Sequence, residues 1–379
     1  MTPDARLIET VRRRLAETGE EATAATVAAA VAAEHGVVGT HQLLAVVDLL
    51  RAEAWGAGPL EPLLRLEGVT DVLVNGPEGV YLDRGRGLEQ QELAFADDAA
   101  VRRLAQRLAA HAGRRLDEAS PWVDARLPDG TRVHAVLAPL ARPGTTISLR
   151  VPARRAFSLS DLVRTGAIDG EGAALLRALI AARAAFVVTG GTGSGKTTVL
   201  AALLGEVPDR ERLVVVEDAS ELRPDHPHVV GLEARPPNVE GAGAVSVRDL
   251  VRQALRMRPD RLVVGEVRGG EVVDLLAALN TGHEGGCGTV HANAPSVVPA
   301  RFEALGVAAG LARDAVHSQL AAGLDAVIHV GRTAGRRHIA EIAGVRRSSE
   351  GWVEVVTAWC ARRGRLADGA QMLDRVLGR

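Results

Sequence analysis

The segment Gly190–Thr197 reads GGTGSGKT and satisfies the pattern G-x-x-x-x-G-K-[ST]. The apolar run 185–189 before it predicts a buried strand, and Thr198–Leu204 after it predicts a helix that ends near Gly205. In such a strand–loop–helix unit, glycines let the backbone approach phosphate oxygens, and the helix amino terminus adds its positive end. An ordinary glycine-rich turn is the weaker interpretation. The pattern predicts a nucleoside triphosphate site in an α/β domain.

The loop residues are the predicted nucleotide contacts. Lys196 would bridge the β- and γ-phosphates, and the Thr197 hydroxyl would hold Mg²⁺. Lys196 is the only lysine among 45 Lys and Arg residues, which indicates that this position needs a compact ammonium rather than a guanidinium. We therefore predict ATP and Mg²⁺ as cofactors, with ATP bound by Gly190, Gly191, Thr192, Gly193, Ser194, Gly195, Lys196, Thr197 and Thr198.

Acidic residues follow two further strand-like runs. Glu217, Asp218 and Glu221 come directly after the run Leu213–Val216, and carboxylates at the carboxyl edge of a parallel strand face the crevice where ligands bind. We predict that these three hold the metal and its water shell. A turn with solvated acids is the alternative that their spacing leaves open.

Glu266 ends the next strand-like run, Leu262–Gly265. A carboxylate there can orient the attacking water or help to hold Mg²⁺, so we predict Glu266 as both a catalytic residue and a metal ligand. Gly265 occupies the place where many P-loop ATPases carry aspartate.

Two of the chain's 11 histidines, His283 and His291, lie within the run 281–293. A zinc site is disfavoured because no paired Cys/His clusters accompany them. We interpret the run as polar residues that report on the γ-phosphate, with Gly285, Gly286 and Gly288 permitting backbone movement. A purely structural role for His291 stays open on spacing alone.

The chain divides into four predicted parts. Apolar residues at three- and four-residue steps predict a helical segment over 1–55. Short alternating runs with turn signals predict an α+β domain over 56–152, and continuous apolar runs predict a parallel-sheet ATPase domain over 153–345. The remainder, 346–379, shows one strand-like run and is predicted to be a carboxy-terminal extension. Pro152 marks a predicted hinge.

Composition excludes several classes of protein. With 379 residues, 47% hydrophobic and 24% charged, the chain is predicted to be globular and multidomain. A formal charge of −2 and 2% aromatic residues disfavour nucleic-acid binding. Two cysteines indicate a reducing compartment. The amino terminus lacks an apolar signal region, and the longest small-apolar stretch, 22–33, is shorter than the ~20 residues a span needs, so we expect a cytoplasmic protein without a transmembrane segment.

Together these segments resemble the type II/IV secretion system ATPase superfamily, most closely the tight-adherence (Flp) pilus assembly branch, near the conjugation-type traffic ATPases. The loop is similar to its Walker A motif, 217–222 to its Asp box, 258–271 to its Glu-bearing Walker B motif and 281–293 to its His box. Segments 71–77 and 123–134 resemble its amino-terminal domain. The resemblance implies a RecA-like P-loop ATPase domain preceded by an α+β (PAS-like) domain.

The resemblance also implies roles and partners. Arg132 and Arg150 would reach the γ-phosphate, with Arg126 a weaker candidate, while Glu266 would be the catalytic carboxylate and His291 the γ-phosphate reporter. It implies a homo-hexamer at the inner face of the cell membrane, working with a membrane platform protein.

Two departures from the family pattern stand out. His134 replaces the usual Asn, which leaves the hydrogen bonding around Arg132 open. Gly286-Cys287-Gly288 replaces a Ser and larger residues, from which we expect a looser loop.

Three functions from different classes follow. The leading hypothesis is an ATPase motor that powers pilus assembly or protein secretion. A conjugative DNA translocase is the second, and a nucleotide-sensing scaffold that does not hydrolyse ATP is the third. A small-molecule kinase fits least, because it would leave the Asp and His boxes unused.

Overall fold

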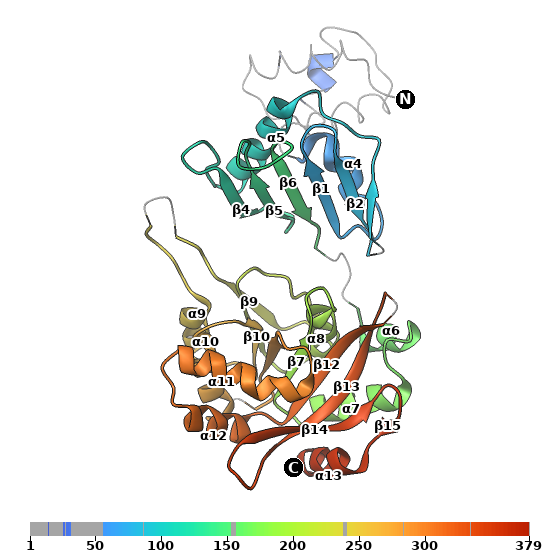
Figure 1. The fold of residues 1–379 in the computed structure, drawn as a ribbon, viewed down its shortest axis with the longest axis vertical. Helices are drawn as coiled ribbons and strands as arrows, with labels where there is room; N and C mark the ends of the chain where they lie inside the picture. The colour runs from blue at the N-terminus through green and yellow to red at the C-terminus, as the bar shows by residue number, and fades with distance from the viewer. Residues whose placement is uncertain are drawn as a thin grey trace. The chain divides into compact units, whose positions relative to one another are not determined.

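The computed structural model describes residues 14, 26, 28–31, 56–85, 87–152, 157–237, 241–282, 284–333 and 335–378. The chain divides into two compact units, Met1–Ala153 and Arg154–Arg379 (Figure 1). Of the helical segment predicted for 1–55, residues 28–31 are helical, and most of the remainder lies outside the described residues, as does His283. Within the described part of the chain, every helix is too short or too polar to cross a membrane.

The first unit is built on an antiparallel sheet of six strands, in the order β3-β2-β1-β6-β5-β4. Strand residues alternate between buried and more exposed positions, as expected for a sheet with one covered face. The strands are β1 Asp71–Asn75, β2 Val80–Asp83, β3 Leu88–Gln90, β4 Trp122–Arg126, β5 Arg132–Val136 and β6 Thr146–Arg150. Within residues 56–152 that the structure describes, the helical segments are η1 Gly58–Leu60, α4 Glu61–Leu64 and α5 Asp98–His111.

Helix α5 covers the apolar face of this sheet. Its buried side chains pack in one cluster with inward-facing strand residues: Val101, Leu104 and Leu108 with Val72, Val133, Ile147 and Leu149. The helix begins where the Asp97 side chain accepts the Ala100 N–H, a standard amino-terminal cap.

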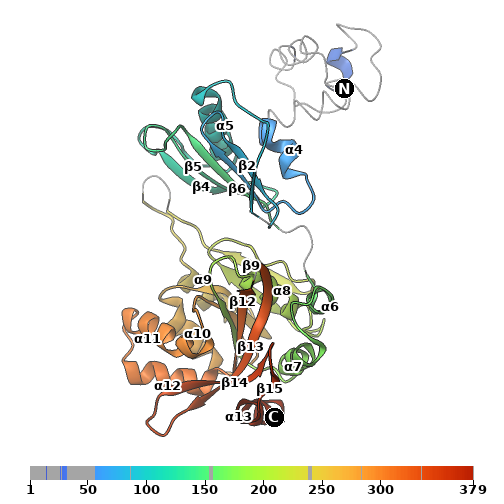
Figure 2. The same ribbon diagram turned by 45° about the vertical axis from the view of Figure 1, so that its right-hand side comes forward.

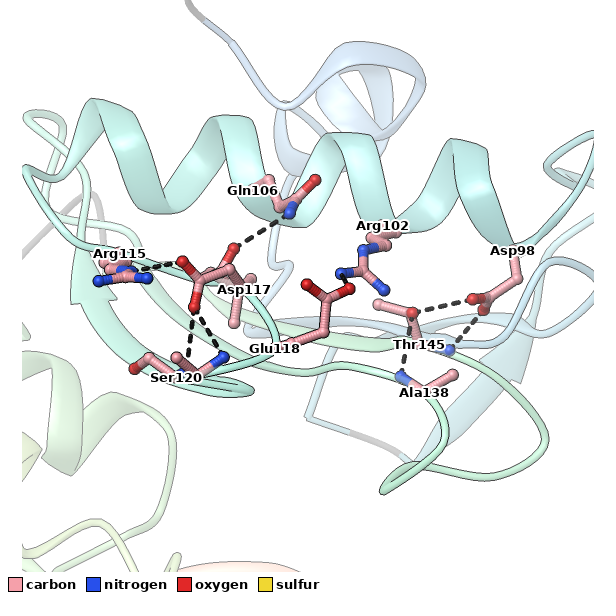
Figure 3. Close-up of polar contacts among 11 residues, drawn as sticks. Asp98, Arg102, Gln106, Arg115, Asp117, Glu118, Ser120, Ala138 and Thr145 are labelled. Atoms are coloured by element: carbon pink, nitrogen blue, oxygen red, sulfur yellow. Dashed lines mark hydrogen bonds and ion pairs between the residues drawn. The ribbon is translucent and has the colours of Figure 1, made fainter.

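Polar contacts fasten α5 to the surrounding loops (Figure 3). The Asp98 carboxylate accepts hydrogen bonds from the backbone N–H (2.5 Å) and the hydroxyl (3.1 Å) of Thr145, at the start of β6. Arg102 pairs with Glu118 at 2.6 Å. Asp117 caps its own turn by accepting the Ser120 N–H, and its hydrogen bond with Arg115 lowers the pKa of the carboxyl. The amino-terminal part of α5 is therefore fastened to the segment before β6 and to the loop after the helix.

The second unit contains a sheet of nine strands, in the order β15-β14-β13-β12-β7-β11-β10-β8-β9. Strands β12, β7, β11, β10, β8 and β9 run parallel, and β13, β14 and β15 extend the sheet antiparallel. The strands are β7 Phe186–Gly190, β8 Leu213–Glu217, β9 Val229–Glu233, β10 Arg261–Val267, β11 Cys287–Val290, β12 Ala326–Thr333, β13 Arg336–Arg347, β14 Val353–Cys360 and β15 Gly364–Arg365.

Helices cover both faces of this sheet (Figure 2). One face packs on α6 Leu159–Arg164, α7 Gly170–Ala181, α8 Lys196–Leu204 and α13 Ala367–Leu377. The other packs on α9 Val247–Ala254, α10 Glu271–Leu279, α11 Val298–Ala308 and α12 Arg313–Gly323, with η2 Pro295–Val297 preceding α11. Burial on both faces explains why β7, β8 and β10 read as continuous apolar runs.

The boundary predicted at residue 345 falls inside strand β13, so residues 346–378 are not a separate extension. They complete the sheet with β14 and β15. Trp359 and Leu373 are fully buried in the same core as α7 and α8. The prediction failed because the only pattern recognised after 345 was one strand-like run, whereas that strand pairs antiparallel with β13 along its length.

Candidate nucleotide-binding site

The phosphate loop rises from the end of β7, which lies between β12 and β11 in the sheet. Gly193 and Gly195 adopt φ values of 68° and 99°, a region that side chains disfavour. Helix α8 begins at Lys196 without a side-chain cap and without an acidic residue in its first turn. Thr197 and Thr198 are half-buried in that turn. These features fit an anionic, phosphate-bearing ligand at the helix amino terminus.

The Lys196 ammonium lies inside the loop. Its Nζ donates hydrogen bonds to the carbonyl oxygens of Gly190 (3.2 Å) and Gly191 (3.1 Å). Partial burial lowers the pKa of Lys196, and the nearby charge of Glu266 opposes that shift. The two predicted catalytic side chains thus belong to the same sheet edge, with Lys196 after β7 and Glu266 near the end of β10.

Glu266 occupies an irregular position in β10. The pairing of β10 with β11 shifts between Val264 and Val267, so Gly265 and Glu266 together face Thr289. Thr289 Oγ1 donates to the Gly265 carbonyl oxygen at 2.7 Å and secures the irregularity. Glu266 is consequently only partly exposed, at the carboxyl edge of the sheet.

Arg268 is a site residue that the sequence reasoning missed. Its guanidinium donates a short hydrogen bond to Glu266 Oε2, and its Nη1 lies 3.7 Å from Asp218 Oδ2. The bond to Glu266 raises the pKa of Arg268. Arg268 lies two residues after Glu266 within the 258–271 motif. In an extended chain that spacing puts two side chains on the same face, and this was the sequence signal for the contact. The guanidinium joins one predicted metal ligand to another.

The Glu217 side chain forms hydrogen bonds with backbone N–H groups. Its Oε1 accepts the N–H groups of Glu221 and Leu222, both at 3.0 Å. Burial raises the pKa of Glu217, although those hydrogen bonds oppose the shift. A Cβ on Gly265 would lie 2.5 Å from Glu217 Cγ, so the Glu217 side chain occupies the space beside that strand position. This explains why residue 265 is glycine.

The predicted metal ligands were Thr197, Glu217, Asp218, Glu221 and Glu266. Among the residues that the structure describes, no three His, Cys, Asp or Glu side chains are grouped so that they could hold a metal ion. Thr197 remains well placed in the first turn of α8, and Asp218 and Glu266 both lie near Arg268. Such a set fits Mg²⁺ held by few protein ligands together with phosphate oxygens. The assignment stays a prediction.

The expectation of a loose loop at Gly286-Cys287-Gly288 is wrong for its second half. Cys287 and Gly288 begin the buried strand β11. A Cβ on Gly288 would lie 2.5 Å from the Val264 carbonyl oxygen, so this glycine permits close strand packing rather than movement. Burial raises the pKa of Cys287 to about 12, which keeps the thiol protonated. His291 follows the strand, at the edge between β7 and β10.

In the first unit, the predicted arginines form a row across three strands. Arg126 of β4 pairs in register with Arg132 of β5, which pairs with Arg150 of β6. The row continues to Asp71, whose Oδ1 lies 3.2 Å from Arg150 Nε. Arg132 lies 3.7 Å from Asp124. Like charges directly opposite one another are unfavourable in a sheet unless an anion meets them.

Residues 53–370 match the family model described as type II/IV secretion system protein. The chain belongs to this family. It is 58% identical to a protein of Mycobacterium tuberculosis named as a conjugal transfer protein. The alignment spans 350 residues, which are 90% of this chain and 99% of the relative. A homologue of the type IV secretion system protein PtlH from Bordetella bronchiseptica is 37% identical, over 62% of this chain and 75% of its own.

Two solved structures share the fold. The pilus retraction motor PilT with bound ADP superimposes with a TM-score of 0.54 at 19% identity, covering 84% of this chain and 86% of its own. The ATPase DotB of Legionella pneumophila gives 0.52 at 19% identity, covering 77% and 79%. The predicted fold, a RecA-like domain after an α+β domain, is confirmed. Because the relatives carry conjugal-transfer and type IV secretion names, the tight-adherence branch stays a prediction.

Proposed function

We propose that this chain is a Mg²⁺-dependent ATPase that drives a secretion or conjugation machine. The observation that carries the proposal is the phosphate loop after β7, where Lys196 Nζ lies against the Gly190 and Gly191 carbonyl oxygens, with Glu266 two strands away near the end of β10. A lysine that can bind phosphate and a carboxylate that can orient a water are two of the groups that phosphoryl transfer to water uses. The solved relatives that are named as ATPases or motors support the same assignment.

Each side chain has a distinct role in this proposal. The Lys196 ammonium would exchange its bonds to the loop carbonyl oxygens for phosphate oxygens. Glu266 Oε2, once released from Arg268, would orient a water and accept its proton. Thr197 would hold the magnesium ion, which when bound neutralises charge on the phosphates. His291 would report on the γ-phosphate from the adjoining strand end.

The arginine row supplies a means of coupling. Arg132 and Arg150 lie side by side on neighbouring strands and pair with Asp124 and Asp71, so a phosphate could take the place of those carboxylates on both guanidiniums. We propose that bound triphosphate attracts this row and that phosphate release frees it, with the hinge near Pro152. Such a cycle suits a homo-hexamer acting with a platform protein at the inner face of the cell membrane.

Two candidate functions differ in what the ATPase moves, a protein or DNA. The relatives named for type IV secretion and the pilus retraction motor of similar fold favour a protein load such as pilin, which includes the tight-adherence branch. The 58% identity to a protein named for conjugal transfer favours a DNA translocase as the second candidate. An ATPase rate that rises with added DNA and falls with salt would favour the translocase.

The chemistry is tested with Glu266→Gln and Lys196→Ala in the purified full chain. We expect Glu266→Gln to bind fluorescent ADP as the wild type does and to hydrolyse ATP about 100-fold more slowly, because only the base is lost. Lys196→Ala should lose binding. Glu350→Gln, at an exposed position outside the site, is the matched control. Unchanged hydrolysis in Glu266→Gln would exclude this mechanism, and a wild type that binds ADP without turnover would indicate the sensing scaffold.

A further inference from the structure

The hairpin between β12 and β13 flanks the phosphate loop on the side away from Glu266. Val330 of β12 pairs with Gly190 at the end of β7. Because the two strands are parallel, the last residues of β12 extend beyond β7 at the edge where the loop lies. Arg332 of β12 and Arg337 of β13 are register partners in this extension. The hairpin therefore brings cationic side chains to the loop.

Arg337 contacts the loop directly. A Cβ on Gly195 would lie 3.4 Å from Arg337 Cδ, so the aliphatic part of Arg337 lies beside the residue that precedes helix α8. The positive φ of Gly195 and this close neighbour both favour glycine there.

The two other arginines near the turn of the hairpin, Arg332 and Arg336, bond to carbonyl oxygens outside the phosphate loop. Arg332 Nε donates to the Gly335 carbonyl oxygen at 3.2 Å, and an Arg336 Nη donates to the Thr165 carbonyl oxygen at 3.3 Å. The Arg337 side chain is exposed and makes no hydrogen bond or ion pair with any residue that the structure describes. Its guanidinium is available to a ligand of the loop.

The order of the strands fixes which part of a nucleotide lies there. Glu266 and His291 follow β10 and β11, on one side of β7, whereas β12 and β13 lie on the other. A nucleotide whose γ-phosphate points toward Glu266 must extend its α-phosphate and nucleoside toward the hairpin. Resting on the proposed function, we propose that Arg337 binds the α-phosphate of the nucleotide. A guanidinium beside a helix amino terminus is well suited to a phosphate group.

A contact at this end distinguishes Arg337 from Lys196 and Glu266. ATP and ADP both carry an α-phosphate, so Arg337 holds them equally and does not act on the bond that breaks. Uniform binding of this kind lowers KM and leaves kcat unchanged.

The test compares Arg337→Ala with Arg336→Ala, the neighbouring arginine that bonds to Thr165, in the full-length chain. Kd values for fluorescent ADP and for a non-hydrolysable ATP analogue are measured by titration, and kcat and KM by phosphate release. We expect Arg337→Ala to weaken both ligands about tenfold and to raise KM, with kcat within about twofold of wild type. Arg337→Lys should recover part of the loss, and Arg336→Ala should bind normally.

Three results would overturn the role of Arg337: an unchanged Kd for ADP in Arg337→Ala, a loss confined to the ATP analogue, or a fall in kcat alone. Failure of the wild type to bind ADP would instead overturn the proposed function and this inference with it. Because the Arg337 side chain is exposed, the thermal unfolding midpoint should stay at the wild-type value, which separates a binding defect from a folding defect.

Discussion

The buried Glu217 carboxylate accepts hydrogen bonds from two consecutive backbone N–H groups and so holds the turn after β8 in place. Removing this acceptor leaves two donors without a partner, and each such loss costs free energy of unfolding. We expect Glu217→Ala to lose about 2–4 kcal/mol of stability. Glu217→Gln keeps the carbonyl oxygen and should lose far less. Urea denaturation of both variants checks this, and equal losses would contradict it.

The same carboxyl predicts a pH dependence. Burial raises the pKa of Glu217 above its ordinary value of 4.5 in the folded chain. Its contribution to stability is therefore fully present below that ordinary value and is lost as pH rises through the folded-state pKa. The stability of wild type relative to Glu217→Gln should fall as pH is raised above 4.5, the ordinary value of the carboxyl, and a rise would contradict the assignment.

Local spacing made Lys196 and Glu266 predictable, because a short motif fixes where each stands relative to its own strand. The roles of Glu217 and Arg337 were not predictable in this way. Glu217 lies against Gly265, and Arg337 lies against Gly195, both far apart in the sequence and adjacent only after the sheet forms. The contact of Arg268 with Glu266 could not be predicted either, because it depends on how the irregularity in β10 directs the Glu266 side chain.

At the scale of elements, strand β11 packs closely against β10. Its Gly288 approaches a backbone oxygen of β10, which cannot move aside as a flexible side chain would. We expect Gly288→Ala to lower the free energy of unfolding by about 1–3 kcal/mol. Gly231→Ala in β9, where no atom lies within 4 Å of the added Cβ, is the matched control and should be nearly neutral. Thermal denaturation measures both. Equal unfolding free energies in the two variants would show that β10 and β11 can move apart to admit the added methyl group.

The strands themselves followed from the sequence with greater certainty than the segments between them. Continuous apolar runs predicted β7, β8 and β10, because burial on both faces leaves little choice of residue. The run that contains β11 is rich in glycine, and glycine is typical of both mobile loops and close strand contacts. Only the packing of Gly288 on Val264 decides between them.

At the scale of the whole molecule, residues 154–379 form a compact unit whose sheet is completed by its last strands. We expect a fragment of residues 154–379 to fold and to bind ADP. A fragment of residues 154–345 should be insoluble or unfolded, because it ends within β13 and lacks Trp359 and Leu373 of the core. Circular dichroism and ADP titration of the pair check this. A stable 154–345 fragment would show that 346–379 is dispensable after all.

The contact between Glu217 and Gly265 also constrains how such a site could change through descent. An aspartate at 265, as found in many other P-loop enzymes, would collide with the neighbouring glutamate. A lineage could acquire it only after residue 217 had become smaller, and that first step alone would weaken the turn after β8. Residue 217 must therefore become smaller before Gly265 is replaced by aspartate, or at the same time. Substitutions at the two positions are not independent of each other.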